Sequence, residues 1–275
     1  MIRPGRFQSL MHHLALIVGG VIMFFPFYYM VIASLKETST FGDVHLYLFP
    51  TEFSLRPYRE LFNGMPYLAY LRNSLYVAVL TTAGTAFFCT LSGYAFSKMQ
   101  FPLRRGLLWF VISVMMIPGA VMLVPSYLLF RELGWLNTYW PLIVPGCAGS
   151  FGVFLSKQFI DSVPDDLIDA ARIDGCSHFR IYWSLILPLS TSLVATLCIL
   201  TFLGSWNNFL GPLIILMDER KYTLPLGLSL LQGQFFQLEN IQMAGATIFI
   251  LPVIVIFSFS QKYIVASLST SGLKG

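Results

Sequence analysis

The chain contains very little charge. Asp, Glu, Lys and Arg make up 11% of its 275 residues, whereas hydrophobic residues make up 56%. The core of a soluble domain of this size is too small to hide so much apolar surface. The scarcity of charge therefore excludes a soluble globular protein and indicates a polytopic, all-α membrane protein.

Charged groups are also missing from the middle of the long apolar runs. Proton- or sodium-coupled carriers and ion pumps keep buried acids or bases there to bind the coupling ion. Their absence argues against both classes of transporter. The sequence has no GxxxxGK[ST] phosphate loop either, so an ATPase site of its own is not expected.

Motifs for catalysis and metal binding are absent as well. The chain has no GxSxG, HExxH or CxxC pattern, and its histidines lie at span ends or in loops. Three of its four cysteines, Cys89, Cys147 and Cys198, fall in apolar runs where packing explains them. We therefore expect neither an enzyme nor a metal site.

What the sequence does contain is a series of long apolar runs. One of them, residues 181–217, holds 37 residues. As a single helix it would be about 55 Å long, more than a bilayer needs. Pro188 and Pro212 divide it, so only its middle part is assigned to the membrane. The six predicted spans are residues 14–35, 73–97, 106–130, 133–156, 189–211 and 240–261.

Prolines and glycines occur within several of these spans. Proline interrupts a membrane helix where neighbouring helices re-satisfy the freed carbonyls, and we expect kinks at such positions. Gly146, Gly149 and Gly152 recur at near-helical spacing in the fourth span. Small residues at this spacing favour close packing against another helix.

The basic residues give the orientation. With the N-terminus inside, the cytoplasmic side holds ten Lys and Arg and five Asp, whereas the outside holds seven basic and eight acidic residues. Positive charge concentrates on the cytoplasmic side of membrane proteins. We therefore expect both termini in the cytoplasm. The net charge of +4 is explained by this topology and does not suggest a nucleic-acid partner.

A cytoplasmic loop, residues 157–188, carries the most compact motif. Pro164 is followed by Asp165 and Asp166, which are favourable near the positive end of a helix dipole, so we expect a helix to start there. Gly175 allows a sharp turn, and Ser177 is suited to cap a second helix that runs to Pro188. The loop should therefore form a pair of short helices.

The first of these helices has two distinct sides. Leu167, Ile168, Ala171 and Ala170 are expected on an apolar side, with Asp166, Asp169 and Arg172 opposite and Asp169 paired with Arg172. Small alanines would let the helix enter a cleft on a partner. An amphipathic helix lying on the lipid surface is the alternative. The pattern alone leaves both possibilities open.

The same loop resembles a known motif. Asp169-Ala170-Ala171, three residues, Gly175, nine residues and then Leu185-Ile186-Leu187-Pro188 resemble the EAA loop, E-A-A-x3-G-x9-I-x-L-P, of ABC-importer permeases. Asp169 stands where the motif has Glu, and Leu185 where it has Ile. The Asp carboxylate is one methylene closer to the backbone than that of Glu, so its contact would be weaker or aimed differently.

Landmarks elsewhere extend the likeness over nearly the whole chain, which resembles the shorter, six-span subunit of maltose-type sugar permeases. These landmarks are Ser34-Leu35-Lys36, Asn73-Ser74-Leu75, Gly93-Tyr94-Ala95-Phe96, Trp206-Asn207-Asn208-Phe209, Tyr222-Thr223-Leu224 and Gly272-Leu273-Lys274-Gly275. The likeness implies a carbohydrate importer of the cytoplasmic (inner) membrane. Its expected partners are a second permease subunit, an ATPase dimer that holds ATP and magnesium, and an external solute-binding protein; no cofactor is expected in this chain.

By position in the motif, the resemblance implies an ATPase-docking core of Asp169, Ala170, Ala171 and Gly175, with Arg172, Ile173 and Asp174 alongside. ATP-driven closure of the ATPase dimer would then switch the permease between inward-facing and outward-facing states.

The substrate path is predicted at Trp206, Asn207, Asn208 and Phe209. Counted from Pro188, Trp206 lies roughly 27 Å along a helix, in the outer half of the bilayer. A Trp at that depth is often an interfacial anchor. The adjacent amides favour a role in the path, because an indole face with amide donors suits a sugar. A stand-alone channel or facilitator, and a structural scaffold, are the competing classes.

Overall fold

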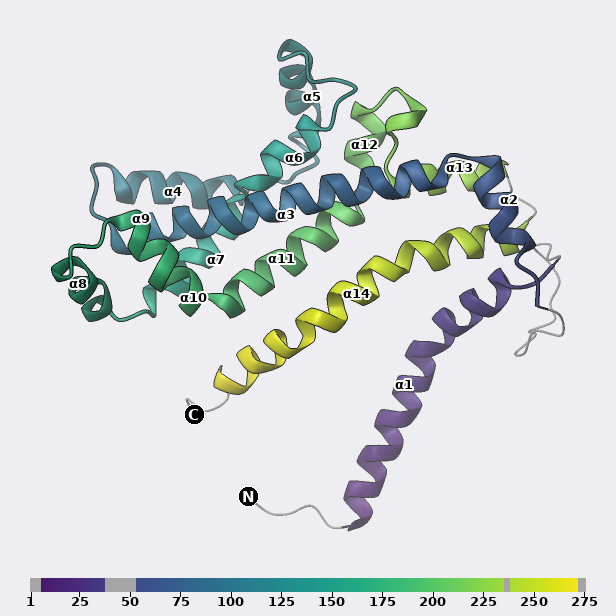
Figure 1. The fold of residues 1–275 in the computed structure, drawn as a ribbon, viewed down its shortest axis with the longest axis horizontal. Helices are drawn as coiled ribbons and strands as arrows, with labels where there is room; N and C mark the ends of the chain where they lie inside the picture. Colours follow the sequence, from purple (N-terminus) through teal and green to yellow (C-terminus); the bar gives the residue numbers. More distant parts are fainter. Residues whose placement is uncertain (1–5, 38–52, 235–237, 272–275) are drawn as a thin grey trace. The chain divides into compact units, whose positions relative to one another are not determined.

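The computed structural model describes residues 6–37, 53–234 and 238–271, and all regular elements in these ranges are helices (Figure 1). The chain divides into two compact units, Met1–Tyr67 with Gly227–Leu251, and Leu68–Leu226 with Pro252–Gly275. The landmark Gly272–Gly275 lies outside the described residues. The two units are treated in turn.

The first unit contains α1 (Arg6–Ser34), α2 (Arg56–Gly64), most of α13 (Leu224–Gln234) and the first part of α14 (Glu239–Ser271). Asn240 Nδ2 donates to the backbone oxygens of Lys36 and Glu37, each at 3.1 Å. Tyr67 Oη donates to the Gly245 carbonyl at 2.5 Å. These bonds tie the start of α14 to the end of α1 and to Tyr67, the first residue of the long helix α3.

The second unit holds the loop at residues 157–188 and most of the predicted spans. Its elements are α3 (Tyr67–Lys98), α4 (Arg104–Val114), α5 (Leu123–Glu132), α6 (Trp140–Cys147), α7 (Ser150–Asp161), α8 (Asp165–Ile173), α9 (His178–Ile181), the π-helical turn η1 (Tyr182–Ile186), α10 (Leu187–Leu189), α11 (Thr191–Trp206), α12 (Leu210–Ile215) and η2 (Glu219–Lys221). In Figure 1 the Lys98 end of α3 lies beside α8 and α9.

One apolar core joins these elements. Its buried members include Cys89 and Tyr94 on α3, Ile160 on α7, Ile168 on α8 and Leu197 on α11. Burial of such side chains is the main force that holds the loop helices onto the long helices.

Glycines set the approach of α3 to α7 and α6. A Cβ at Gly152 would lie 2.7 Å from Cys89 Sγ, and one at Gly146 would lie 2.5 Å from Thr81 Cγ2, whereas Gly149 faces open space. The predicted close packing is therefore confirmed for Gly146 and Gly152 and wrong for Gly149.

Gly93 of α3 lies against the backbone of α7. A Cβ there would meet Ser156 and lie 2.8 Å from the Lys157 backbone nitrogen, which cannot move aside. We expect Gly93→Ala to destabilise the protein by about 1–3 kcal/mol, as overpacking does. Thermal melting in detergent measures this. Gly204→Ala, in α11 with no neighbour within 4 Å, is the control; equal melting temperatures of the two variants would contradict the prediction.

Two of the landmarks meet in space. Asn73 Nδ2 donates to the backbone oxygens of Arg220, at 2.9 Å, and Tyr222, at 3.0 Å. Ser74 Oγ accepts from the Leu224 nitrogen at 2.7 Å. The start of α3 therefore clamps the loop after α12, which gives the Asn-Ser and Tyr-Thr-Leu patterns a structural reason.

Four helices in the described part of the chain are long and apolar enough to cross a membrane: Gln8–Ser34, Tyr67–Lys98, Trp140–Asp161 and Glu239–Phe259. A fifth span would be the pair His178–Leu189 and Thr191–Trp206, bent by 81°. The bend falls two residues after Pro188, close to the predicted division. The count of six spans stays a prediction.

The apolar run 106–130 is not one helix. Residues 115–122, which include Pro118, separate α4 from α5. Proline removes a backbone donor and clashes with the preceding turn, so the helix ends before it. The run 133–156 likewise becomes helical only at Trp140, because Gly134 and Asn137 adopt positive φ values of 68° and 56°.

Candidate functional site: the loop at residues 157–188 and the end of α11

Helix α8 forms where the sequence predicted it. It begins at Asp165, directly after Pro164, and carries both predicted aspartates in its first turn. Gly175 has φ of +79°, which permits the turn that ends the helix. Ser177 Oγ accepts from the Arg180 nitrogen at 3.4 Å and caps α9. The helix pair of the loop is therefore built from local sequence signals.

The faces of α8 differ in part from the prediction. Ile168 is buried and Ala171 is half-buried against the core. Leu167 and Ala170 are exposed, so of the four residues predicted on the apolar side only Ile168 and Ala171 pack against this chain's own core. Asp169, Arg172, Asp174 and Gly175 are not enclosed by the core, and Ile173 is 87% exposed. The helix therefore packs on the core along one side only, through Ile168 and Ala171, and its other side exposes acidic, small and apolar side chains.

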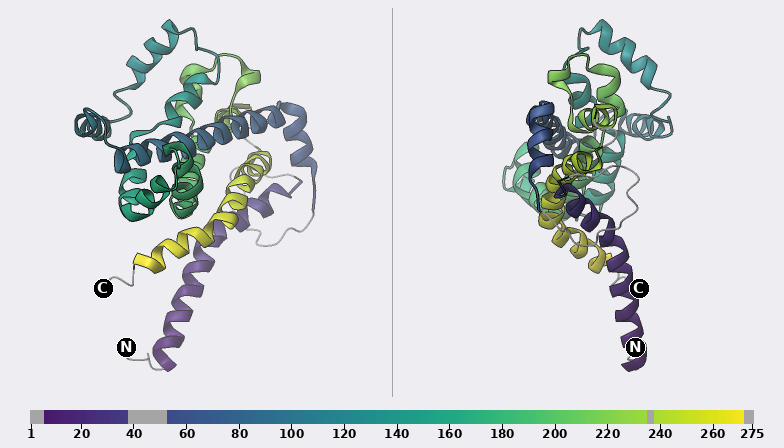
Figure 2. Two further views of the ribbon diagram at one scale, coloured as in Figure 1. Left: turned by 60° about the vertical axis from the view of Figure 1, so that its left-hand side comes forward. Right: turned by 90° about the vertical axis from the view of Figure 1, so that its right-hand side faces the viewer.

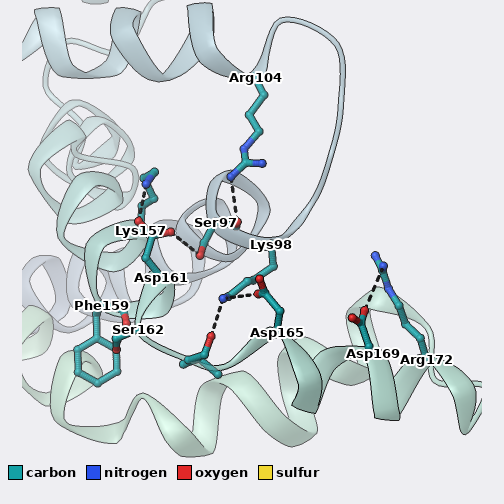
Figure 3. A network of polar contacts seen from close by, with 11 residues as sticks. Ser97, Lys98, Arg104, Lys157, Phe159, Asp161, Ser162, Asp165, Asp169 and Arg172 are labelled. Carbon is teal, nitrogen blue, oxygen red and sulfur yellow. Dashed lines mark hydrogen bonds and ion pairs between the residues drawn. The ribbon is translucent and has the colours of Figure 1, made fainter.

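Lys98, at the end of α3, anchors the start of α8 (Figure 3). Its ammonium donates to the Val163 carbonyl and to Asp165 Oδ1, each at 2.6 Å, and its side chain is only 6% exposed. Asp161 of α7 accepts from Ser97 Oγ at 2.7 Å and pairs with Lys157. These contacts connect the last turn of α3 to Asp161 at the end of α7 and to Asp165 at the start of α8.

A second set of contacts holds the far end of α8. Arg172 lies 3.9 Å from Asp169, as predicted, and its guanidinium lies 3.3 Å from His178 Nε2. The other ring nitrogen of His178 lies 3.3 Å from Tyr94 Oη on α3. The chain of contacts Asp169–Arg172–His178–Tyr94 thus links α8 through α9 to α3.

Lys98 should matter for stability in a pH-dependent way. Its hydrogen bond and charge hold the pKa of the Asp165 carboxyl below its usual range. The pair therefore stabilises the fold above the ordinary carboxyl pKa, and this contribution disappears as the pH falls through the lowered pKa. Lys98→Met also removes a charged hydrogen bond to the buried Val163 carbonyl, which contributes about 1.5–3 kcal/mol.

We expect Lys98→Met to lower the melting temperature at pH 7, and the part due to Asp165 to diminish as the pH falls from about 4 through the lowered pKa of its carboxyl. Melting in detergent between pH 7 and pH 3 measures both. Arg105→Met, at an exposed neighbouring site, is the control. A loss in the Lys98 variant that is the same at every pH would leave only the Val163 bond as its cause.

The residues predicted for the substrate path separate in the structure. Trp206 is fully buried and stacks on Phe202, with 5.6 Å between ring centroids. Asn207, Asn208 and Phe209 connect α11 to α12 and are exposed. The predicted span 189–211 therefore ends as a helix at Trp206. The indole does not share an open surface with the two amides.

Both amides are engaged locally at this break. Asn207 Nδ2 donates to the Leu203 carbonyl at 2.8 Å, and Asn208 Oδ1 accepts from the Gly211 nitrogen at 3.1 Å. Asn208 thus satisfies a backbone N–H at the start of α12, whereas the Leu203 carbonyl also accepts from the Asn207 backbone nitrogen at 3.0 Å.

Sequence reasoning missed three residues that position the loop: Lys98, Tyr94 and His178. Lys98 is the first basic residue after the second predicted span. Its position therefore indicated the end of that span, but not the residues to which its ammonium donates. Its contacts with Val163 and Asp165 span 65 and 67 positions of sequence. No local pattern reveals such pairs.

Residues 88–270 match the family described as "Binding-protein-dependent transport system inner membrane component". The chain belongs to this family of inner-membrane permeases, and the resemblance seen in the sequence is confirmed at that level.

Individual proteins similar to this chain are consistent with its membership of the permease family. The chain is 36% identical over 259 residues to the arabinooligosaccharides transport system permease protein AraQ of Bacillus subtilis (strain 168), with 93% of this chain and 92% of the relative covered. It is 30% identical to the sn-glycerol-3-phosphate transport system permease protein UgpE of Brucella abortus (strain 2308), with 98% of each covered. A chain of a bacterial ABC transporter involved in the import of the acidic polysaccharide alginate shares the fold, with a TM-score of 0.83, 20% identity, and 96% of this chain and 99% of that chain covered.

Proposed function

We propose that this chain is the permease subunit of a binding-protein-dependent ABC importer that moves a sugar or related carbohydrate across the cytoplasmic membrane. ATP hydrolysis in partner subunits would drive it. The observation that carries the proposal is helix α8, which is fixed to the long helices through Ile168 and Lys98 while its outer face stays exposed. Membership of the permease family and the names of the relatives support the carbohydrate class.

The proposed role of α8 is to dock in a groove of the ATPase. Asp169, Ala170 and Ile173 lie on exposed parts of the helix, away from Ile168, and Asp166 and Asp174 add acidic groups beside them. An acidic surface is repelled by the anionic lipids of the cytoplasmic leaflet, which argues against the alternative of resting on lipid. Small and acidic side chains suit a groove with basic groups instead.

The anchoring contacts support a mechanical role. Because Lys98 and the Arg172–His178–Tyr94 contacts tie both ends of α8 to α3, a displacement of α8 by the ATPase would be transmitted to a long helix. ATP and magnesium would be held by the ATPase subunits, and this chain would have no catalytic role. A second permease subunit and an external solute-binding protein would complete the complex. Both termini are proposed to lie in the cytoplasm.

Reconstitution tests the proposal. The chain would be placed in proteoliposomes with its partner permease, ATPase and binding protein, and uptake of labelled neutral and anionic carbohydrates would be measured with and without ATP. We expect uptake only from the whole complex with ATP. Uptake by this chain alone, without ATP, would instead establish a channel or facilitator.

A further inference from the structure

A cavity of about 320 Å³ lies in the second unit, between α5, α6 and α12, and its lining is mostly apolar with three polar side chains, Ser126, Tyr127 and Asn208. Its lining is Leu123, Ser126, Tyr127, Phe130, Pro141, Leu142, Pro145, Gly146, Asn208, Gly211, Ile214 and Ile215. Figures 1 and 2 show α6 and α12 as neighbours, and the two helices pack together. The cavity lies where two runs of apolar sequence are broken, before α5 and between α11 and α12.

Broken membrane helices are a recurrent way of building transporter sites, because the interruption brings polar groups to membrane depth. Here the break before α5 places Ser126 and Tyr127 in the lining, and the break after α11 places Asn208 there. One of the two amides predicted for the substrate path therefore reaches a cavity, together with two residues that sequence reasoning did not select.

The polar groups in this lining have spare hydrogen-bonding capacity. Asn208 Oδ1 accepts from the Gly211 nitrogen, but among the described residues its Nδ2 donates to no protein group. Within the same ranges, Ser126 Oγ and Tyr127 Oη make no hydrogen bond to the protein. Asn208 is exposed and Ser126 and Tyr127 are partly exposed, so these amide and hydroxyl groups are accessible to a ligand that carries hydroxyls of its own.

The lining carries no Asp, Glu, Lys or Arg. The nearest charged groups along α5 are Arg131 and Glu132, which pair with each other at 2.9 Å and lie outside the cavity. An anionic ligand would lose its hydration here without gaining a cation. A neutral sugar loses less hydration free energy on entering the cavity than an anion does. Its hydroxyls can bond to the amide and hydroxyl groups, and its C–H face can pack on Tyr127 and Phe130.

We propose that this cavity is a subsite for one neutral monosaccharide unit, with Tyr127 and Phe130 as the stacking surface and Asn208 and Ser126 as hydrogen-bond partners. The volume is at the small end of ligand pockets, so it takes one unit and not a long chain. The inference rests on the proposed importer function and narrows its substrate to uncharged carbohydrate.

The test uses the whole reconstituted complex. Labelled arabinotriose and maltose serve as neutral probes, and sn-glycerol-3-phosphate and an alginate trisaccharide as anionic probes. Tyr127→Ala and Asn208→Ala are compared with Leu129→Ala and Leu213→Ala, which remove exposed apolar side chains from α5 and α12 outside the lining. Ser126→Trp, which fills the cavity, is a further variant.

For the wild type, we expect uptake of a neutral probe. The cavity variants should lower it at least about tenfold, while ATP hydrolysis stimulated by the loaded binding protein stays within about twofold of wild type and the leucine controls stay unchanged. Unchanged uptake in Tyr127→Ala, Asn208→Ala and Ser126→Trp would overturn the subsite. Uptake of only the anionic probes would overturn its neutral class.

Two further outcomes distinguish a failure of the subsite from a failure of the importer function. If the cavity variants no longer copurify with the partner permease, the cavity is part of a subunit interface and the subsite is wrong. If the wild-type complex takes up none of the probes with ATP, the proposed carbohydrate function fails before the subsite is reached.

Discussion

Ala170→Trp is expected to reduce ATP-driven uptake at least about thirtyfold. Ala170 lies on the exposed face of α8, away from Ile168, so the larger side chain is accommodated within this chain. In the proposed complex it would enter the ATPase groove, where loss of a central contact costs about 2 kcal/mol or more. The effect should therefore arise at the interface and not in the fold.

Copurification of the ATPase and uptake by the reconstituted complex measure this effect, and the melting temperature of the permease alone shows whether the fold is intact. Ser184→Trp is the matched control, because Ser184 is exposed in the same loop but lies in η1, outside α8. Normal ATPase binding by the Ala170 variant would remove the outer face of α8 from the docking surface.

Gly175→Val is the second change with a large expected effect. The backbone at Gly175 has φ of +79°, and a Cβ would meet nothing within 4 Å, so the cost is conformational and not steric crowding by neighbours. A β-branched residue in the left-handed region costs about 1–3 kcal/mol. To avoid this strain the turn would change, and α8 would shift relative to α9.

Because α8 is the proposed docking element, such a shift should abolish uptake and weaken ATPase binding in addition to lowering stability. Gly175→Asn is the discriminating control, since Asn tolerates this backbone conformation and introduces a comparable volume. We expect the Asn variant to retain most of its uptake. If the Asn and Val variants lose uptake equally, the space around residue 175 and not its backbone conformation is what coupling requires.

The sequence predicted the helices of the loop at residues 157–188 well because their signals are local. Asp165 and Asp166 start α8, Gly175 ends it and Ser177 caps α9, each within a few residues of the element that it defines. The Asp169–Arg172 pair is three residues apart on one helix and was equally readable. Membership of the permease family was also readable, because the motif spacing covers most of the chain.

The surroundings of the residues proposed for the substrate path were harder to predict because they come from distant segments. Trp206 and Asn208 are two residues apart, yet one is buried against Phe202 and the other lines the cavity beside Tyr127. The break at Asn207 turns the chain between them. Hydropathy counts each apolar run as one span and does not record such a break.

The sequence by itself determined that the chain is an apolar, helical permease with a charged helical loop at residues 157–188, because hydrophobicity, charge and turn residues act locally. Only the tertiary structure decided which face of α8 stays free, that Lys98 anchors it, and that Ser126, Tyr127 and Asn208 share a cavity. Those facts depend on contacts between side chains far apart in sequence, and such contacts exist only once the helices have packed.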